Sequence, residues 1–321
     1  MYWEKVKIIK DDGKEVEAIA PLIISASRAT DIPAFYSKWF FNRLKKGYIK
    51  WINPFNNTFQ YVSFKNLRVI VFWSKNPKQI FPYLKELDDL GINYYFQFTL
   101  NDYEEENFEP NIPKLNERIE TFKELSNRIG KEKIIWRFDP LILTDKINVD
   151  VLLDRIKNIG DKIHNYTEKL VISFVDIEIY SKVKKNLKNF GINAKEFEIK
   201  DIEKIANGLK NINKEWNLKI STCAEKVNLE RYGIEHNKCI DDELMRKVFY
   251  KDKKLIDFLS KKNLKDKGQR KECKCIVSKD IGQYNTCPHL CVYCYANYSK
   301  SIVMKNFKNH NENFESIVIT S

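Results

Sequence analysis

The sequence lacks the features that mark several common classes of protein. It contains no apolar run approaching the roughly 20 residues that cross a bilayer. Residues 1–15 show neither the apolar stretch nor the small-residue cleavage site of a signal peptide. The GxGxxG, Walker A and HExxH motifs are absent, so nothing in the sequence supports a dinucleotide, nucleoside triphosphate or zinc-protease site. We therefore expect a cytoplasmic protein with no membrane partner.

The composition indicates a folded, basic chain. Apolar residues make up 43% of the 321 residues and aromatic residues 13%, which excludes disorder as the dominant state. The formal net charge of +12 suits nucleic acid, an acidic substrate or an anionic surface. The lysines are spread along the chain, however, and no run resembles a basic arm. Charge alone therefore gives nucleic acid only weak support.

Short runs rich in β-branched and aromatic residues alternate with helix-like segments. The expected strands are Pro21–Ser25, Arg68–Trp73, Tyr94–Leu100, Ile134–Phe138, Leu170–Val175 and Leu218–Thr222. The expected helices are Pro33–Lys46, Pro77–Leu90, Leu115–Ile129, Val149–Ile163, Ser181–Phe190 and Ile199–Trp216. This alternation, without a glycine-rich fingerprint, predicts an α/β fold of the (β/α)-barrel type rather than a Rossmann sheet. No linker divides the chain, so we expect one integrated domain: a barrel core over 1–222, completed or capped by a cysteine-rich cluster-binding segment over 223–321.

All seven cysteines lie in the last third of the chain. A cytosolic protein keeps its thiols reduced, and an odd count fits disulfide pairing poorly, so the cysteines predict a metal site or catalysis. Cys287, Cys291 and Cys294 have the spacing C-x3-C-x2-C, and a short loop of this kind can turn three thiolates toward one point. Three ligands leave one iron of a [4Fe–4S] cluster open to a chelating molecule. A zinc site formed by these cysteines with His289 is the alternative.

The segment 285–297, NTCPHLCVYCYAN, resembles the cluster motif of the radical S-adenosylmethionine (SAM) superfamily. Its residues are especially similar to the motif of spore photoproduct lyase. The resemblance implies that Cys287, Cys291 and Cys294 hold a [4Fe–4S] cluster. It also implies that SAM chelates the fourth iron and that Tyr293 lies close to SAM. The segments ISASRATDIPAFY, VFWSKNP, YYFQFTL, WRFDPLIL and 269–297 further resemble one family of uncharacterised bacterial proteins, which carries its cysteine motif at the C-terminus.

Four cysteines remain outside this motif: Cys223, Cys239, Cys273 and Cys275. Four thiolates are the full set for a closed [4Fe–4S] cluster or for a tetrahedral zinc ion. We expect them to form a second metal site, with an iron–sulfur cluster favoured over zinc. The alternative is that some of them are ordinary buried thiols, because cysteine packs well in apolar cores.

The position of the motif departs from the superfamily's usual plan, in which the cysteine loop follows the first barrel strand. Two arrangements fit a motif near the end of the chain. Residues 275–284 could form a strand that closes the barrel ahead of the cluster loop, which would make the fold a partial or circularly permuted TIM-type barrel. Alternatively, the loop could fold over the barrel mouth as a lid. We favour the first, because residues 276–283 have the pattern of a strand followed by a turn.

Polar residues follow the expected strands, at the end where (β/α) barrels carry their chemistry. SAM requires partners for its carboxylate, amine, ribose and adenine. We expect SAM to contact Tyr293, Arg28, Asn76, Gln97 and Ser173, and we expect Lys75, Arg137 and Asp139 to act in catalysis. For Arg137 and Asp139, a buried ion pair is an equally good interpretation.

The resemblance implies an enzyme that takes one electron from a carrier such as flavodoxin or ferredoxin. SAM then splits to methionine and a 5′-deoxyadenosyl radical, which abstracts hydrogen from the substrate. We expect a small-molecule substrate. The alternatives are a radical SAM enzyme that acts on nucleic acid and a non-catalytic iron–sulfur or zinc protein.

Overall fold

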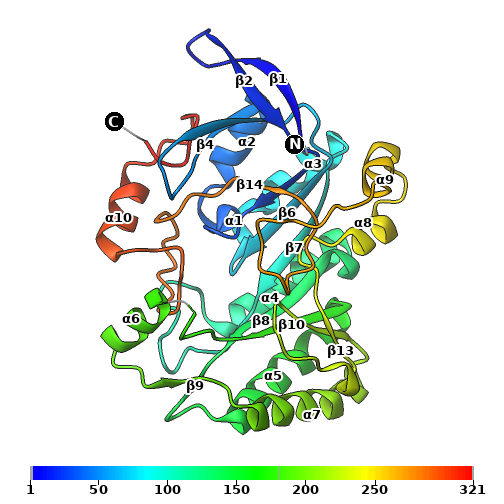
Figure 1. Ribbon diagram of the computed structural model, residues 1–321, viewed down its shortest axis with the longest axis vertical. Helices are drawn as coiled ribbons and strands as arrows, with labels where there is room; N and C mark the ends of the chain where they lie inside the picture. The colour runs from blue at the N-terminus through cyan, green and yellow to red at the C-terminus, as the bar shows by residue number, and fades with distance from the viewer. Residues whose placement is uncertain (1–2, 180, 320–321) are drawn as a thin grey trace.

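A sheet of eight parallel strands forms the centre of the molecule (Figure 1). The computed structural model describes residues 3–179 and 181–319. Residues 1–2 and 180 of the expected barrel core, and residues 320–321 of the expected cysteine-rich segment, lie outside the described residues. The strand order is β13-β12-β10-β8-β7-β6-β3-β14. The bounds are β3 Ile23–Ala26, β6 Val69–Ser74, β7 Asn93–Thr99, β8 Ile134–Leu141, β10 Lys169–Phe174, β12 Lys219–Thr222, β13 Ile234–His236 and β14 Lys279–Asp280. Each of the six predicted strands falls on one of these, and the α/β class is confirmed.

Three predicted helices have their predicted bounds: α4 Leu115–Ile129, α5 Val149–Ile163 and α7 Ile199–Trp216. A fourth, α6, spans Ser181–Asn189. The segments expected as single helices near the N-terminus are each divided, into α1 Ile32–Phe35 and α2 Ser37–Lys46, and into the 3₁₀ helix η1 Pro77–Tyr83 and α3 Leu84–Asp89. Pro82 explains the second division, because proline lacks the N–H that an α-helix needs at that position.

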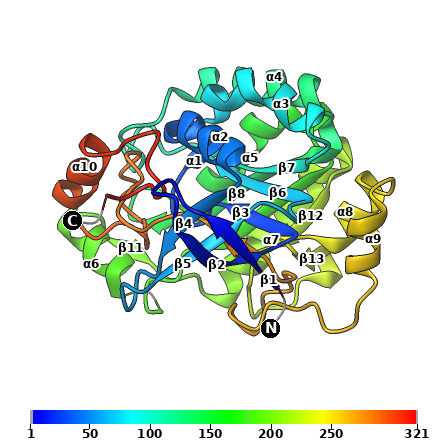
Figure 2. The same ribbon diagram turned by 90° about the horizontal axis from the view of Figure 1, so that it is seen from above.

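The central sheet is buried on both faces, as parallel sheets usually are. On one face, Ile24, Ile70 and Phe96 pack with the helices in the larger apolar core; Figure 2 shows α2, α3 and α4 along one side of the sheet. The other face, with Val71 and Tyr95, packs against α8 Asp242–Val248 and α9 Lys253–Leu259. Three of the cysteines belong to this second core.

A second, four-stranded sheet was not predicted. Its order is β1-β2-β5-β4, and its strands are β1 Glu4–Ile9, β2 Glu15–Ala20, β5 Phe59–Ser63 and β4 Tyr48–Ile52. The β1–β2 hairpin projects from one end of the molecule (Figure 1). Charged residues alternate with apolar ones in β1, so this strand has no continuous apolar run. A two-stranded sheet (β9 Leu143–Thr144, β11 Ala194–Lys195), the short helices η2 Lys131–Lys133, η3 His164–Tyr166 and η4 Glu230–Tyr232, and α10 Lys300–Lys308 complete the fold.

The last strand, β14, places the cysteine loop beside the start of the central sheet. Residues 275–284 were expected to form a strand, and only Lys279–Asp280 do so. These two residues pair in parallel with Ile24 and Ser25 of β3. Within the described residues, β13 and β14 end the sheet and no pairing joins them, so a closed barrel is not seen.

No helix in the described part of the chain combines the length and the apolar character needed to span a membrane.

Candidate functional site

All seven cysteines line a single cavity of about 380 Å³. The cavity opens where the central strands end, and Arg28, Lys75 and Ser173, which follow or end β3, β6 and β10, also line it. This is the edge at which (β/α) folds bind their ligands. The two groups of cysteines that are separate in the sequence therefore share one site.

The loop of Cys287, Cys291 and Cys294 is held in place by hydrogen bonds from the segment 108–111 and from neighbouring residues. The amide of Asn111 donates to the Pro288 carbonyl at 2.8 Å, and the Val292 N–H donates to the Phe108 carbonyl at 2.9 Å. Burial raises the pKa of all three thiols. Without a metal the thiols are therefore protonated at neutral pH, and a metal must displace those protons when it binds.

His289, between two of these cysteines, is engaged elsewhere. Its Nε2 lies 2.9 Å from an Asp31 carboxylate oxygen, and its Nδ1 lies 3.3 Å from the Asn111 carbonyl oxygen. Both ring nitrogens therefore face acceptors rather than the cysteines. This arrangement gives no support to a zinc site of three cysteines and His289.

Lys75 and Tyr293 belong to one buried network centred on Glu109, a residue that no sequence motif indicates. The Lys75 amine donates to Glu109 at 2.6 Å and to the Tyr293 hydroxyl at 3.0 Å. The Tyr293 hydroxyl also donates to Glu109, and Asn101 contacts both groups. Burial lowers the pKa of Lys75, but Glu109 outweighs it, so the pKa is raised and Lys75 is charged. Tyr293 is thus fixed through its hydroxyl, beside Cys291.

Arg137 and Asp139 form the buried ion pair that was one of the two interpretations of their sequence. The Arg137 Nε atom donates to Asp139 at 3.0 Å, and the Ser173 hydroxyl donates to the other carboxylate oxygen. Both charged side chains line the cavity, as does Ser173. The Arg137 Nη1 atom donates to the Gln97 side chain at 3.1 Å and to Cys239 Sγ at 3.0 Å.

Three buried donors that line the cavity have no hydrogen-bond partner in the described structure: Arg28 Nη2, Thr30 Oγ1 and Trp73 Nε1. The guanidinium groups of Arg28 and Arg137 both lie over the Trp73 ring, at 5.4 and 5.1 Å from its centre. A buried donor without a partner costs about 1–3 kcal/mol. The wall of the cavity therefore offers free donors to a polar ligand.

Two predicted SAM contacts are not among the cavity-lining residues. Gln97 is buried, and its amide donates to the Cys239 carbonyl at 2.9 Å. Asn76 directly precedes η1, and its backbone N–H donates to the Ser74 hydroxyl. Arg28, Ser173 and Tyr293 do line the cavity. Glu109 could not have been found from the sequence, because its surroundings, YEEENFEP, have the charge of an exposed loop.

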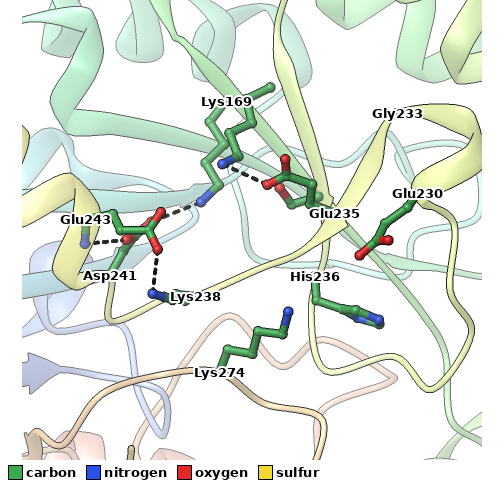
Figure 3. Close-up of a pocket in the computed structure, with 11 residues that line it drawn as sticks. Lys169, Glu230, Gly233, Glu235, His236, Lys238, Asp241, Glu243 and Lys274 are labelled. Carbon is green, nitrogen blue, oxygen red and sulfur yellow. Dashed lines mark hydrogen bonds and ion pairs between the residues drawn. The ribbon is translucent and has the colours of Figure 1, made fainter. Parts of the chain in front are cut away.

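A second cavity, of about 320 Å³, lies toward the beginning of β10 and β12 (Figure 3). Its charged groups are largely paired: Lys169 lies 3.1 Å from Asp241, and Lys219 lies 2.8 Å from Glu235. None of the seven cysteines, all of which are described, lines this cavity. The cysteine-lined cavity is therefore the candidate functional site.

A family model described as a domain of unknown function, DUF1848, matches residues 23–296. The chain belongs to the DUF1848 family. The match runs from β3 to just beyond Cys294, so it includes every residue of the cavity described above. It also agrees with the resemblance to an uncharacterised family that the sequence segments indicated. No curated protein and no solved structure matches the chain.

Proposed function

We propose that this member of the DUF1848 family is a radical SAM enzyme, in which Cys287, Cys291 and Cys294 hold a [4Fe–4S] cluster. The observation that carries the proposal is the cavity itself. Three thiols from a C-x3-C-x2-C loop open onto it together with Tyr293 and with donors that have no partner. Thiolates are the usual ligands of iron–sulfur clusters, and three of them leave one iron open. The described residues therefore fit both the cluster and a polar ligand such as SAM.

When bound, the cluster would supply one electron, from a carrier such as flavodoxin or ferredoxin, and SAM would supply a 5′-deoxyadenosyl radical for hydrogen abstraction. The chain's own residues provide a fixed and partly dry enclosure. Glu109 and Lys75 hold Tyr293 against the cavity, and Asp31 holds the loop through His289. Phe174 and Val175 contribute apolar wall, which helps to exclude water.

Arg28 and Thr30 are the residues that we assign to polar contacts with SAM, because each has a buried donor without a partner. Arg28 is suited to the carboxylate of SAM, since a guanidinium binds carboxylates with two parallel hydrogen bonds. Ser173 is committed to Asp139 through its hydroxyl proton, so it can serve SAM only as an acceptor. We further propose that Arg137 and Asp139 orient groups in the cavity rather than transfer protons, because they are paired with each other.

The position of β14 supports a circularly permuted, partial (β/α) barrel. The superfamily's cysteine loop follows the first barrel strand, and here the loop follows β14, which pairs in parallel with β3. In space the loop therefore follows an edge strand of the sheet, although it comes late in the sequence. The lid arrangement would not require a strand directly ahead of the loop. The cysteines lie within a cavity rather than on an open surface, so we propose a small-molecule substrate.

The test is anaerobic reconstitution with iron and sulfide, followed by incubation with SAM and dithionite. We expect 5′-deoxyadenosine and methionine to form, and Cys291→Ala to abolish both while the fold is retained by circular dichroism. A fully loaded wild-type protein that leaves SAM intact would refute the proposal. Formation of 5′-deoxyadenosine by Cys291→Ala at the wild-type rate would refute the assignment of the three cysteines.

A further inference from the structure

The four cysteines outside the loop motif come together from three separate segments. Cys223 directly follows β12, Cys239 lies in the loop between β13 and α8, and Cys273 and Cys275 precede β14. The sulfur atoms of Cys223 and Cys239 are 3.5 Å apart. The Cys275 sulfur accepts the backbone N–H of Cys239 at 3.2 Å. The four thiols come from segments up to 52 positions apart in the chain, and contact between sulfur atoms goes beyond the ordinary packing of cysteine in an apolar core.

Hydrogen-bond donors are directed at these sulfur atoms. Cys239 Sγ receives Arg137 Nη1 and Asn237 Nδ2, each at 3.0 Å. Cys275 Sγ receives a second backbone N–H, from Ile240, at 3.4 Å. A neutral thiol is a weak acceptor, whereas a thiolate is a strong one. The donors are therefore placed for sulfur atoms that carry negative charge.

The charges around the four thiols lead to the same conclusion. Arg137 is 2% exposed and donates hydrogen bonds both to Cys239 Sγ and to Asp139. The buried Nη2 of Arg28 has no hydrogen-bond partner. Asp139 pairs with Arg137, and Asp280 is the carboxylate that acts on Arg28. Thiolates would add negative charge beside both guanidinium groups, because metal binding displaces the protons of buried thiols.

We infer that Cys223, Cys239, Cys273 and Cys275 form a second metal centre, which holds a [4Fe–4S] cluster in the same cavity as the first. The four thiols line the wall of the cavity, which leaves room for a cluster with its own volume. Four cysteine thiolates are also the full set for a tetrahedral zinc ion, and the metal analysis below distinguishes the two. When a preformed cluster binds, each thiol releases its proton to solvent, and no electron transfer is required.

The experiment measures iron, acid-labile sulfide and zinc in anaerobically reconstituted protein, so it does not depend on SAM cleavage. We compare the wild-type chain with the variant Cys287→Ala/Cys291→Ala/Cys294→Ala, which lacks the loop ligands, and with Cys273→Ser/Cys275→Ser. We expect about eight irons per wild-type chain and about four in each variant, since each cubane holds four irons. Loss of all iron from the loop variant would overturn the inference, and so would one zinc in place of its iron. The loop variant decides the question even if the other variant does not fold.

Arg137 gives a second readout, because it donates to Cys239 Sγ. In the loop variant, we expect Arg137→Gln to keep the iron and to lower the midpoint potential, since a positive charge and an N–H···S bond that favour the reduced cluster are lost. Arg128→Gln, on the exposed side of α4, is the control and should leave the potential unchanged. An unchanged potential in Arg137→Gln would place the cluster away from Cys239 and overturn the assignment. A wild-type chain with two clusters that does not cleave SAM would refute the proposed function but not this centre.

Discussion

The carboxylate of Asp280 accepts a hydrogen bond of 2.9 Å from the Ser25 hydroxyl, although the two residues are 255 positions apart in the chain. The same carboxylate accepts the Arg28 N–H at 2.9 Å and the Gly282 N–H at 2.9 Å. Asp280 therefore joins β14 to the end of β3 and to the loop that carries Arg28. The cysteine loop follows a few residues later, so this carboxylate fixes where that loop begins.

We expect Asp280→Ala to lower the free energy of unfolding by about 1–3 kcal/mol, because it leaves the buried Ser25 hydroxyl and two backbone N–H groups without an acceptor. Urea denaturation of the metal-free protein measures this change. Asp89→Ala, which breaks an exposed pair with Lys85, is the control and should cost about 1 kcal/mol or less. Equal losses in the two variants would show that Asp280 does not fasten β14 to the sheet.

The buried Glu109 is expected to be the main compensating charge for Lys75 and Arg118. These two cations lie 2.6 and 3.9 Å from it, and all three side chains are largely buried. Removing one partner of a buried ion pair typically costs about 3–5 kcal/mol, and we expect a loss of that size for Glu109→Gln at pH 7. Glu124→Gln, on the surface of α4, is the control, and its loss should stay below about 1 kcal/mol. Similar losses in the two variants would contradict a central role for Glu109.

The same carboxylate predicts a pH dependence. Burial raises the pKa of Glu109, but Lys75 and Arg118 outweigh it, and the net pKa lies below its ordinary value. Such a group stabilises the folded state fully above its unfolded pKa of about 4.3, and the stabilisation is lost as pH falls through the lower folded pKa. The difference in unfolding free energy between the wild type and Glu109→Gln should therefore be constant near neutrality and shrink below about pH 4.3. If this difference in unfolding free energy instead grew as the pH fell, the pKa of Glu109 would be raised in the folded state, not lowered.

The charged amine of Lys279 should destabilise the folded state at neutral pH. Burial lowers its pKa to about 8, although Asp280 acts in the other direction. The unfolded chain therefore binds more protons between about pH 8 and 10.4, and stability due to this residue rises over that range. We expect Lys279→Met to be more stable than the wild type at pH 7, with the advantage falling as pH rises toward 10. The amine also lies 3.2 Å from the centre of the Trp51 ring. A variant less stable at pH 7 would show that this ring contact outweighs the burial of the charge.

Two helical glycines provide a matched test of packing. A Cβ atom on Gly160 of α5 would lie 2.1 Å from the Trp216 ring, and one on Gly208 of α7 would lie 2.4 Å from the end of the Leu153 side chain. Both substitutions to alanine gain about 1 kcal/mol in helix propensity. The Trp216 ring is buried and cannot yield, whereas Leu153 can change rotamer. We expect Gly160→Ala to lose about 1–3 kcal/mol by thermal or urea denaturation and Gly208→Ala to lose much less. The reverse order would contradict the packing of α5 against α7.

Helices α4, α5 and α7 could be predicted with their bounds, because each has a strong amphipathic pattern that the core determines directly. The sheet of β1, β2, β4 and β5 could not, because its outer positions are charged and its pairing connects distant segments. A (β/α) barrel, partial or circularly permuted, was expected from the alternation of strands and helices, but periodicity does not say whether the end strands meet.

For the site, the sequence indicated two groups of cysteines and the polar residues at strand ends, because both can be identified from residue types and their spacing along the chain. Cys275 lies only twelve positions before Cys287, which favoured a second site close to the first. That all seven thiols share one cavity depends on how the segments before β14 fold back over the sheet, which the sequence does not indicate. Glu109 was missed for a related reason: a carboxylate becomes significant only when folding buries it beside Lys75. Gln97 and Asn76 were assigned to SAM from their places in or just after a predicted strand, and neither lines the cavity. The Gln97 amide donates to the Cys239 carbonyl, and the Asn76 backbone N–H donates to the Ser74 hydroxyl.

The pairing of β14 with β3 also bears on how the protein is made. A ribosome releases β3 early, and its partner strand some 255 residues later. Throughout most of its synthesis, the nascent chain therefore presents an unpaired strand edge, which is the kind of edge that invites aggregation. The thiols of the loop emerge later still, so metal insertion can begin only once the sheet beneath them is nearly finished.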